Sequence, residues 1–436
     1  MKIKDISSER FTQNFVRKGL RLERQILAGA IASCSSVACT SSIGAPDKEF
    51  FASRLNSRTE FEVPKGAPKI NYIDLFSGGG GLSLGVHEAI QSVGLQPKLV
   101  AAYDVDPMAL TLLKTQFKPL LSRATDVSRL VDFTVDHSGH SVNFVSEPII
   151  VDRELNDVRS QIQLLVGGPP CQGHSNLNNR TRGSDERNRL YYIMPAVAIS
   201  LDIPFVIIEN VVSIKSSHED VTKIARNLFE SAGYGVQEVI IDATKFGVAQ
   251  TRRRHFMVAT KTQIDSDLNL ANTVKQFNVP LMTFDDINYN TPQLEYHSTL
   301  MESAPDLSQI NKDRIKFLHD NDVYDLPNQE RPDCHKDGTT YKSVYGRMRP
   351  NLPAPTITGG FNTPGRGRFV HPHEARVINI REASRIQGFP DWYWEPCESL
   401  GFLGAHYKKI IGDAVPPPMV HPIIFALANQ LMHEVI

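Results

Sequence analysis

Short apolar runs alternate with stretches of helical periodicity through the middle of the chain. The runs are rich in branched side chains and stop at Gly, Pro or an acidic residue, which is typical of buried parallel strands. They lie at Ile70–Leu75, Leu99–Tyr103, Leu164–Val166, Pro204–Ile208, Gly235–Ile241 and His255–Thr260, with helices predicted over Leu82–Ile90, Tyr191–Leu201 and Val221–Ala232. This order predicts an α/β fold in which helices cover both faces of a largely parallel sheet.

The pattern weakens on both sides of this region. Residues 1–65 contain one candidate amphipathic helix, around Phe11–Leu27, and are interpreted as an N-terminal extension of unknown role. Residues 281–385 are rich in Pro, Asn, Asp and Gly and predict a smaller, irregular lobe. Helical periodicity returns at Glu382–Gln387 and Val420–Val435, and the second of these helices is expected to return to the first domain. The predicted domains are 1–65, 66–280, 281–385 and 386–436.

A glycine-rich turn follows the first predicted strand. Ser77–Gly81 leads directly into a predicted helix, whose first backbone amides are free to bind a ligand. The second predicted strand ends in Asp104, roughly 20 or more residues after the glycines, where such folds bind ribose hydroxyls. Because the loop lacks a G-x-G-x-x-G pattern, a smaller adenosyl ligand is favoured over a dinucleotide. A simple packing turn is the alternative.

A stiff turn, GGPPCQGHSN at 167–176, places Cys171 at the end of another predicted strand. Two glycines and two prolines fix the backbone, so the chain sets the direction of the thiol. The thiol is either a nucleophile or, as is commoner for a lone cysteine, a buried structural group. Asp104, Cys171 and Glu209 all follow apolar runs. Since the carboxyl ends of parallel strands share one edge, these three residues are predicted to share a cleft.

Charge and cysteine content narrow the possible partners and sites. The formal net charge is −1, so nucleic-acid binding would require a local patch, and arginines do cluster at 180–189, 252–254 and 347–368. The five cysteines are an odd number and widely spaced, which indicates a reducing compartment and no metal site. Residues 26–43 have too little apolar length for a signal peptide, and no window approaches the roughly 20 apolar residues of a membrane span.

Six motifs occur in the order and spacing of the cytosine-5 DNA methyltransferases. They are DLFSGGGGLSLG (74–85), GGPPCQGHS (167–175), ENV (209–211), QTRRRHF (250–256), REASRIQGFPDWY (381–393) and GDAVPPPM (412–419). From about residue 70 to its end the chain resembles this family, and in particular the bacterial modification enzymes of restriction-modification systems. The resemblance implies a Rossmann-like, S-adenosylmethionine-dependent methyltransferase sheet with a second, smaller, irregular target-recognition domain.

The resemblance also implies a covalent mechanism. The Cys171 thiolate would add to carbon 6 of cytosine, which makes carbon 5 able to attack a methyl group. Glu209 would act at ring nitrogen 3, Arg254 would approach the base, and Arg252 would help to order the cysteine loop. The base would have to leave the duplex stack, at a cost of roughly a few kcal/mol.

S-adenosylmethionine is the cofactor that the resemblance implies. The residues implied to bind it are Phe76, Gly78, Gly79, Gly81, Asp104, Val105, Asp126, Pro170, Leu190, Asp413 and Val415. The acid that binds adenine is open between Asp126, which is favoured, Asp152 and Asp157. The residues implied to contact DNA are Gln172, Ser175, Gln250, Thr356, Arg366 and Arg368. Asp413, at a position where the family usually has Asn, and His174, at a position where it often has an aromatic residue, depart from the pattern.

The function that the motifs favour is methylation of carbon 5 of cytosine in a specific sequence of double-stranded DNA. The enzyme would belong to a restriction-modification system, with a companion restriction endonuclease, and would act as a monomer in the cytoplasm, associated with the nucleoid if bacterial. An RNA (tRNA) cytosine-5 methyltransferase is one alternative. A catalytically silent DNA-binding relative is another, but such a protein has no chemical need for Cys171, Glu209, Arg252 and Arg254 together.

Overall fold

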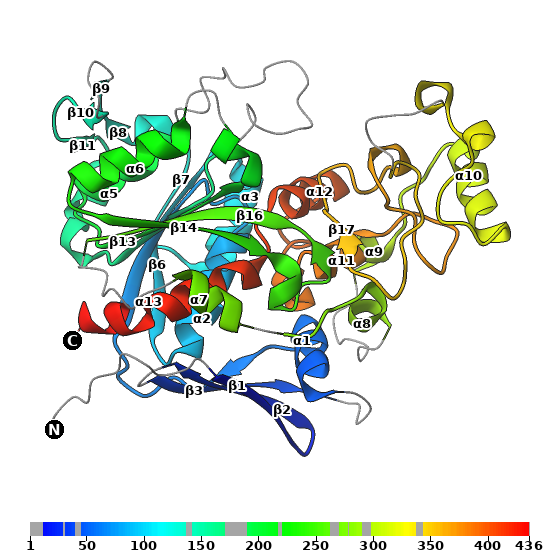
Figure 1. Ribbon diagram of the computed structural model, residues 1–436, viewed down its shortest axis with the longest axis horizontal. Coiled ribbons are helices and arrows are strands. Elements are labelled where there is room, and N and C mark those ends of the chain that lie inside the picture. Colours follow the sequence, from blue (N-terminus) through cyan, green and yellow to red (C-terminus); the bar gives the residue numbers. More distant parts are fainter. Residues whose placement is uncertain are drawn as a thin grey trace.

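The protein consists of a large α/β domain, a smaller lobe beside it and a small N-terminal β-sheet beneath the α/β domain in the view of Figure 1. The computed structural model describes residues 12–28, 31–39, 45–136, 142–170, 190–216, 220–261, 270–277, 279–289, 298–336 and 343–435.

A seven-stranded sheet with the order β14-β16-β13-β12-β5-β6-β7 forms the centre of the α/β domain. The strands from β13 to β7 pair in parallel, whereas β16 is antiparallel to both of its neighbours. The predicted, largely parallel sheet is therefore confirmed, with one reversed strand. The strands are β5 (Lys69–Leu75), β6 (Gln96–Asp104), β7 (Leu121–Ala124), β12 (Leu164–Gly167), β13 (Phe205–Val211), β14 (Gly235–Asp242) and β16 (Arg253–Thr260).

Alternate residues of the central strands enter two separate cores. In β13, Phe205 and Ile207 join one apolar cluster while Val206 and Ile208 join the other, and all four are fully buried. The two-residue period of a strand thus explains how one sheet binds helices on both faces. The first core contains side chains of α2 (Gly81–Ser92), α3 (Pro107–Phe117), α7 (Leu270–Gln276) and α13 (His421–His433), and the second contains those of α5 (Ile193–Ser200) and α6 (Val221–Ser231).

Between β7 and β12 the chain makes a short excursion at the edge of the sheet. Two small antiparallel pairs form there, β11 with β8 and β10 with β9. The elements are η1 (Val127–Arg129), β8 (Val131–Asp132), β9 (Val135–Asp136), β10 (Asn143–Phe144), β11 (Ile149–Ile150), α4 (Arg153–Asp157) and η2 (Arg159–Gln161).

The smaller lobe has short elements and a small apolar core, as the sequence predicts for this irregular region. Its outer cluster consists of Ile315, Leu318, Leu326, Val370 and Val377. Other apolar side chains of the lobe belong to the first core, among them Phe284, Ile287, Phe361 and Phe369. The elements are α8 (Phe284–Asn288), α9 (Thr299–Glu302), α10 (Gln309–Asp320), η6 (Asn328–Glu330), η7 (Asp333–His335), β17 (Ala354–Pro355) and η8 (Pro364–Arg366). The chain then returns through α11 (Ile380–Ile386), η9 (Asp391–Trp394), α12 (Gly404–Asp413) and η10 (Pro417–Val420) to α13, which packs against α2 as expected.

The helix predicted around Phe11–Leu27 is wrong, because the described part of this segment forms strands. Gly19, with a φ of 60°, lies in the tight turn between the first two strands, and Leu22, Arg24 and Ile26 alternate toward the buried face. The antiparallel sheet has the order β1-β2-β3-β4. Its elements are β1 (Thr12–Lys18), β2 (Arg21–Ala28), β3 (Ile31–Ala38) and β4 (Glu60–Phe61), with α1 (Pro46–Asn56) between β3 and β4.

The C-terminal stretch Gly404–His433 is long and apolar enough, by composition, to cross a membrane, which the sequence scan did not anticipate. Its most apolar window is 72% buried inside the protein. Proline residues at 416–418 separate α12 from α13 within it. The stretch is therefore part of the core of the α/β domain.

Candidate active site

The glycine loop and Asp104 meet at the carboxyl edge of β5 and β6. The backbone N–H of Gly78 donates to Oδ2 of Asp104 at 2.7 Å, and the N–H of Asp106 donates to Oδ1 at 2.8 Å. These bonds fix the carboxylate beside the start of α2, whose first amides have no partner within the helix. The strand, glycine loop, helix and acid therefore adopt the arrangement that the sequence predicts.

The glycine loop is closed on one side and open on the other. A Cβ atom on Gly79 would lie 2.3 Å from Cγ2 of Ile410, and one on Gly81 would lie 2.7 Å from the carbonyl oxygen of Val415. A Cβ on Gly78, which has a φ of 49°, would have no atom within 4 Å. Phe76 has a φ of 58°, a strained conformation for a residue that is not glycine. The loop thus rests on the C-terminal region and leaves space at Gly78.

Glu209 and Arg254 form an ion pair in the same region of the sheet. Arg254 Nε lies 2.9 Å from Glu209 Oε1, and the two side chains are only 15% and 10% exposed. The reversed direction of β16 makes this possible, because Arg254, near its beginning, pairs with Val211 at the end of β13. A parallel β16 would carry Arg254 to the opposite edge.

The first residues of the cysteine loop lie against Glu209. The Asn210 side chain donates to the carbonyl oxygen of Pro169 at 3.0 Å, and a Cβ atom on Gly168 would be 3.3 Å from Glu209 Oε2. Cys171, Gln172, His174 and Ser175 lie outside the described residues. Pro170 and Leu190, on either side of that gap, are both partly buried.

Arg252 and Gln250 connect the α/β domain to the C-terminal half of the chain. Arg252 is 4% exposed and donates to the carbonyl oxygens of Ile357 and Ala414, each at 3.0 Å. Gln250 is fully buried, donates to Gln387 Oε1 at 2.5 Å and accepts from the N–H of Ile357 at 3.0 Å. Gln250 therefore does not face a surface where DNA could bind, which corrects its expected DNA contact. Its amide group is used inside the protein.

The three acids that are candidates for binding adenine differ in their exposure and in the partners that they already have. Asp152 accepts from Tyr103 at 3.0 Å and from Arg123 Nε at 2.7 Å, and it also caps α4. Asp157 is exposed at the end of α4, away from any strand end. Asp126 is exposed beside the end of β7, next to β6, where the backbone of Thr125 donates to the Asp104 carbonyl oxygen. These positions keep Asp126 as the favoured acid.

Other residues implied to bind the cofactor lie near the same edge. Val105, directly after Asp104, is 68% exposed, which is unusual for valine. Val415 contacts the chain at Gly81, and its side chain would also touch a Cβ on Gly168. Asp413 is exposed and pairs with Lys409 at 3.2 Å.

The residues of the smaller lobe that were expected to contact DNA fall into two groups. Arg366 is exposed, and the partly exposed Thr356 donates to the carbonyl oxygen of Thr251 at 2.8 Å. Arg368 instead donates to Asp325 at 2.5 Å and to the carbonyl oxygens of Tyr324 and Arg347. Its guanidinium group is partly exposed, and its expected role in DNA binding stays a prediction.

Two further residues support the glycine loop and were missed in the sequence. The Tyr393 hydroxyl donates to the carbonyl oxygen of Gly79 at 2.6 Å, across 314 positions of sequence. Asp74 accepts from the Ser83 hydroxyl at 2.6 Å, and burial raises the pKa of Asp74 to about 7. Both belong to quoted motifs, and only the fold reveals their contacts. Among the described residues, no group of three His, Cys, Asp or Glu side chains could hold a metal ion.

Comparison with known proteins gives consistent matches. Residues 70–429 match the model of a family described as C-5 cytosine-specific DNA methylase. The chain is 38% identical over 370 residues to the Type II methyltransferase M1.BsuMI of Bacillus subtilis, which covers 83% of this chain and 81% of that protein. It is 28% identical over 293 residues to the Type II methylase M.HgiDII of Herpetosiphon aurantiacus, covering 65% and 81%.

The fold is also similar to solved structures. A prophage-encoded DNA modification methyltransferase from E. coli superposes with a TM-score of 0.52 at 23% identity, covering 83% of this chain and 99% of that one. At this identity the likeness concerns the fold.

Proposed function

The chain belongs to the C-5 cytosine-specific DNA methylase family, and we propose that its methyl transfer takes place where the cysteine loop begins beside Glu209. One observation carries this proposal: the buried Glu209–Arg254 pair lies against Gly168 and Pro169, the residues that lead into Cys171. A carboxylate and a guanidinium group beside a stiff cysteine turn provide a nucleophile, a proton carrier and a fixed positive charge within one site.

In the proposed reaction, the Cys171 thiolate forms a bond to carbon 6 of a flipped-out cytosine. Glu209 holds a proton at ring nitrogen 3, which stabilises the electron density that the attack places on the ring; such a contribution is worth roughly 10²–10⁴-fold in rate. Arg254 keeps Glu209 Oε1 engaged, so that the other carboxyl oxygen can serve the base. Carbon 5 would then form a bond to the methyl group that the cofactor supplies. Loss of the carbon 5 proton and of the thiolate would restore the aromatic ring and free Cys171.

Methyltransferases of this family use S-adenosylmethionine, and the residues present fit such a molecule. The open space at Gly78 and the free amides at the start of α2 suit a close approach of the ligand, and Asp104 suits ribose hydroxyls. Phe76, Val105, Asp126, Pro170, Leu190 and Val415 would complete the pocket. The cofactor supplies an electrophilic methyl group on a sulfonium.

DNA is the substrate of the family, and we assign its sequence recognition to the smaller lobe, whose irregular backbone suits the reading of base edges. Exposed Arg366 and Thr356 are candidates for contacts to the duplex. The Type II names of the relatives favour a role in a restriction-modification system with a companion endonuclease. We further propose that the protein acts as a monomer in the cytoplasm. The family description favours DNA over tRNA.

A covalent-trapping experiment tests the proposed site. Wild-type protein, incubated with S-adenosylmethionine and duplex DNA containing 5-fluorocytosine at its target, should form a denaturation-resistant adduct. Cys171→Ala should form none, while Cys334→Ala, which removes an exposed cysteine of the smaller lobe, should still form it. Bisulfite sequencing of DNA from expressing cells identifies the target sequence beforehand. An adduct in Cys171→Ala, or methylation of tRNA in place of DNA, would contradict the proposal.

A further inference from the structure

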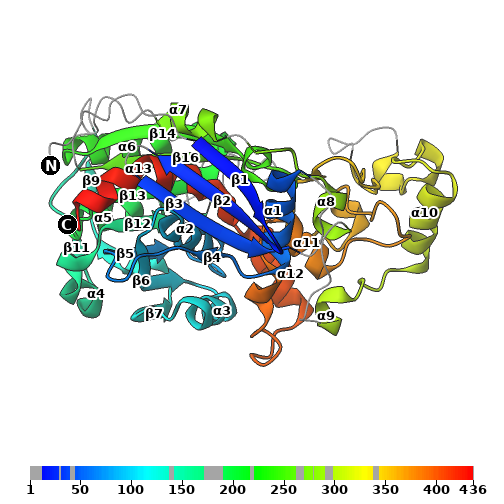
Figure 2. The same ribbon diagram turned by 90° about the horizontal axis from the view of Figure 1, so that it is seen from below.

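The N-terminal segment, residues 12–61, lies outside the part of the chain that matches the family, yet it contacts both bodies of the protein. Figure 2 shows β1, β2 and β3 across the α2 and α13 side of the α/β domain, with α1 next to the smaller lobe. Contacts of β3 with α2 and of α1 with α8 and η9 agree with this view.

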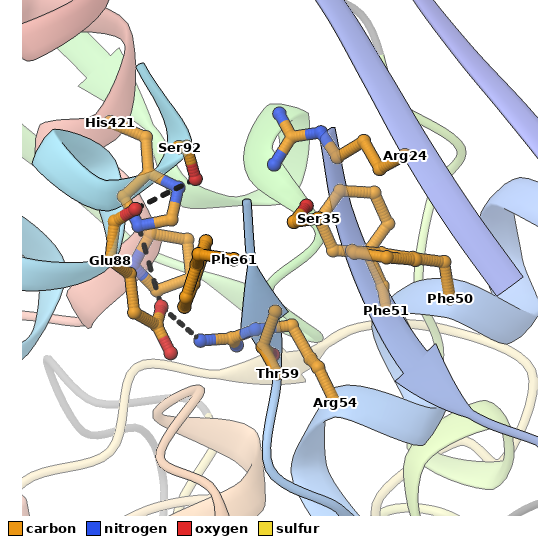
Figure 3. Close-up of a pocket in the computed structure, with 11 residues that line it drawn as sticks. Arg24, Ser35, Phe50, Phe51, Arg54, Thr59, Phe61, Glu88, Ser92 and His421 are labelled. Atoms are coloured by element: carbon orange, nitrogen blue, oxygen red, sulfur yellow. Dashed lines mark hydrogen bonds and ion pairs between the residues drawn. The ribbon is translucent and has the colours of Figure 1, made fainter. Parts of the chain in front are cut away.

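A buried ion pair anchors the segment to the α/β domain. Arg54 Nη2, on α1, lies 2.6 Å from Glu88 Oε2 on α2, and the two side chains are 5% and 9% exposed. His421 on α13 lies 3.5 Å from the same carboxylate oxygen, and Figure 3 shows these groups converging. Arg54 also donates to the carbonyl oxygen of Gly388 at 3.1 Å, beyond the end of α11. One side chain thus joins three elements that are distant in sequence.

Contacts with aromatic rings also attach the N-terminal segment to the α/β domain. The Arg24 guanidinium group lies 5.0 Å from the ring centroid of Phe277 and 5.9 Å from that of Phe425. Phe51 packs so closely that a Cβ atom on Gly247 would lie 2.2 Å from its ring. Gly247 ends the turn just before Gln250, so α1 supports the motif that carries Arg252 and Arg254.

Four contacts connect α1 and the residues after it to the base of the smaller lobe, at α8, α11 and the end of η9. Lys48 Nζ lies 3.0 Å from Asp286 Oδ2 of α8, and Arg385 of α11 donates to Asn56 Oδ1 at 2.6 Å. Arg58 pairs with Glu395 at 2.9 Å and lies 4.5 Å from the ring centroid of Trp392. The chain enters the lobe at α8 and leaves it at α11. These contacts therefore hold the lobe at its attachment point.

We propose that α1 and Arg58 are positioning elements that fix the smaller lobe at a set angle to the α/β domain, so that the N-terminal segment contributes to DNA binding. This inference rests on the proposed role of that lobe in DNA recognition. Buried Arg54 attaches α1 to the α/β domain. The ion pairs of Lys48 and Arg58 attach α1 and the residues after it to the base of the lobe. Partly exposed pairs add little to the stability of a whole fold. At the base of a lobe they can still set its orientation.

Charge reversal tests the proposal on the full chain. The double variant Lys48→Glu/Arg58→Glu should raise the KM for duplex DNA roughly threefold to tenfold, with the KM for S-adenosylmethionine and the Tm nearly unchanged. Adding Asp286→Lys/Glu395→Arg should restore the KM for DNA. The matched control, Lys18→Glu/Arg21→Glu, changes the net charge equally but breaks pairs to Glu23 and Glu60 within the N-terminal sheet, and it should bind DNA nearly as the wild type does.

Each outcome is decisive. An unchanged KM for DNA in the double variant, an equal rise in the control, or no rescue by the swapped charges would overturn the proposal. A fall in Tm together with higher KM values for both substrates would show a purely structural role and would overturn it too. If the wild-type protein itself fails to methylate DNA, the proposed function fails instead, and the two failures are distinguishable.

Discussion

The α/β domain and the smaller lobe are held together by different forces. In the domain, strand residues such as Leu165 and Ile207 are fully buried in two large apolar cores. In the lobe and its base, whose apolar side chains form one small outer cluster and an extension of the first core, arginines also bind carboxylates and backbone carbonyl oxygens. The ion pairs of this second group are Arg347–Asp322, Arg368–Asp325, Arg376–Glu382, Arg381–Asp391 and Arg385–Asp391.

This difference suits the two tasks that we propose for the two regions. A close-packed apolar core resists deformation, so it can hold Glu209 and the glycine loop in one geometry. Directional hydrogen bonds order an irregular backbone without requiring strands or helices, so the lobe can present loops to DNA. In the proposed division, apolar packing supports the chemistry and polar contacts support DNA recognition.

The largest effect on activity should come from Glu209→Gln, which tests the chemistry of the α/β domain while leaving its packing unchanged. The variant removes the proton carrier, and we expect kcat to fall by roughly 10²–10⁴-fold while the shape of the side chain is retained. Single-turnover kinetics should detect the fall, with the KM for S-adenosylmethionine and the Tm close to wild type. A variant with normal kcat would mean that Glu209 only orders Arg254.

The next largest effect is a loss of stability, and it can be compared for one buried residue in each region. Asp391 is fully buried and accepts from Arg381 and Arg385, so Asp391→Ala should destabilise the protein by about 3–5 kcal/mol. Leu165→Ala should cost about 2–5 kcal/mol by opening a cavity in the sheet. Urea unfolding measures both free energies. At concentrations where both variants are folded, Asp391→Ala should raise the KM for DNA more than Leu165→Ala does. Equal effects on the KM for DNA would contradict the comparison.

The smallest effect concerns stability at low pH. Acid should destabilise the base of the lobe more than the apolar core. Burial alone would raise the pKa of Glu382, but hydrogen bonds from Arg376 and His371 outweigh it and lower the pKa from 4.5 to about 2. The stabilisation is complete above about pH 4.5 and is lost as the pH falls toward 2. Glu382→Gln should be less stable than wild type at pH 7, and the gap between them should narrow below pH 4.5. A gap that stays constant down to pH 3 would refute this assignment.

The sequence predicts the parts of the protein that rest on local pattern. Branched apolar runs located the central strands, and the positions of Asp104 and Glu209 at strand ends located the edge where they lie. The reversed direction of β16 was not predictable from such runs, because a buried strand has the same composition in either direction. Roles assigned to Cys171, Gln172 and Ser175 stay predictions, since these residues lie outside the described part of the chain.

The errors occurred where distant residues decide a side chain's environment. Arg24 occupies a buried position between Leu22 and Ile26, and this charge hid the two-residue period of β2. Its burial depends on rings that come from positions more than 250 residues later. The resemblance implies a DNA contact for Gln250, yet its partners are buried backbone and side-chain groups of the protein, which no local pattern reveals.

The chain begins and ends the smaller lobe at neighbouring points. Arg385 of α11 donates to the carbonyl oxygen of Ile287 in α8 at 3.2 Å, and the two helices pack together. Between them, α10 extends away from the α/β domain in Figure 1, whereas residues 354–357 return to it and pair with residues 250–252. A graft that replaces the outer part around α10 and keeps residues 354–357 would leave the partners of Arg252 and Gln250 in place. The DNA sequence that the protein prefers could thus be changed while its methylating site is retained.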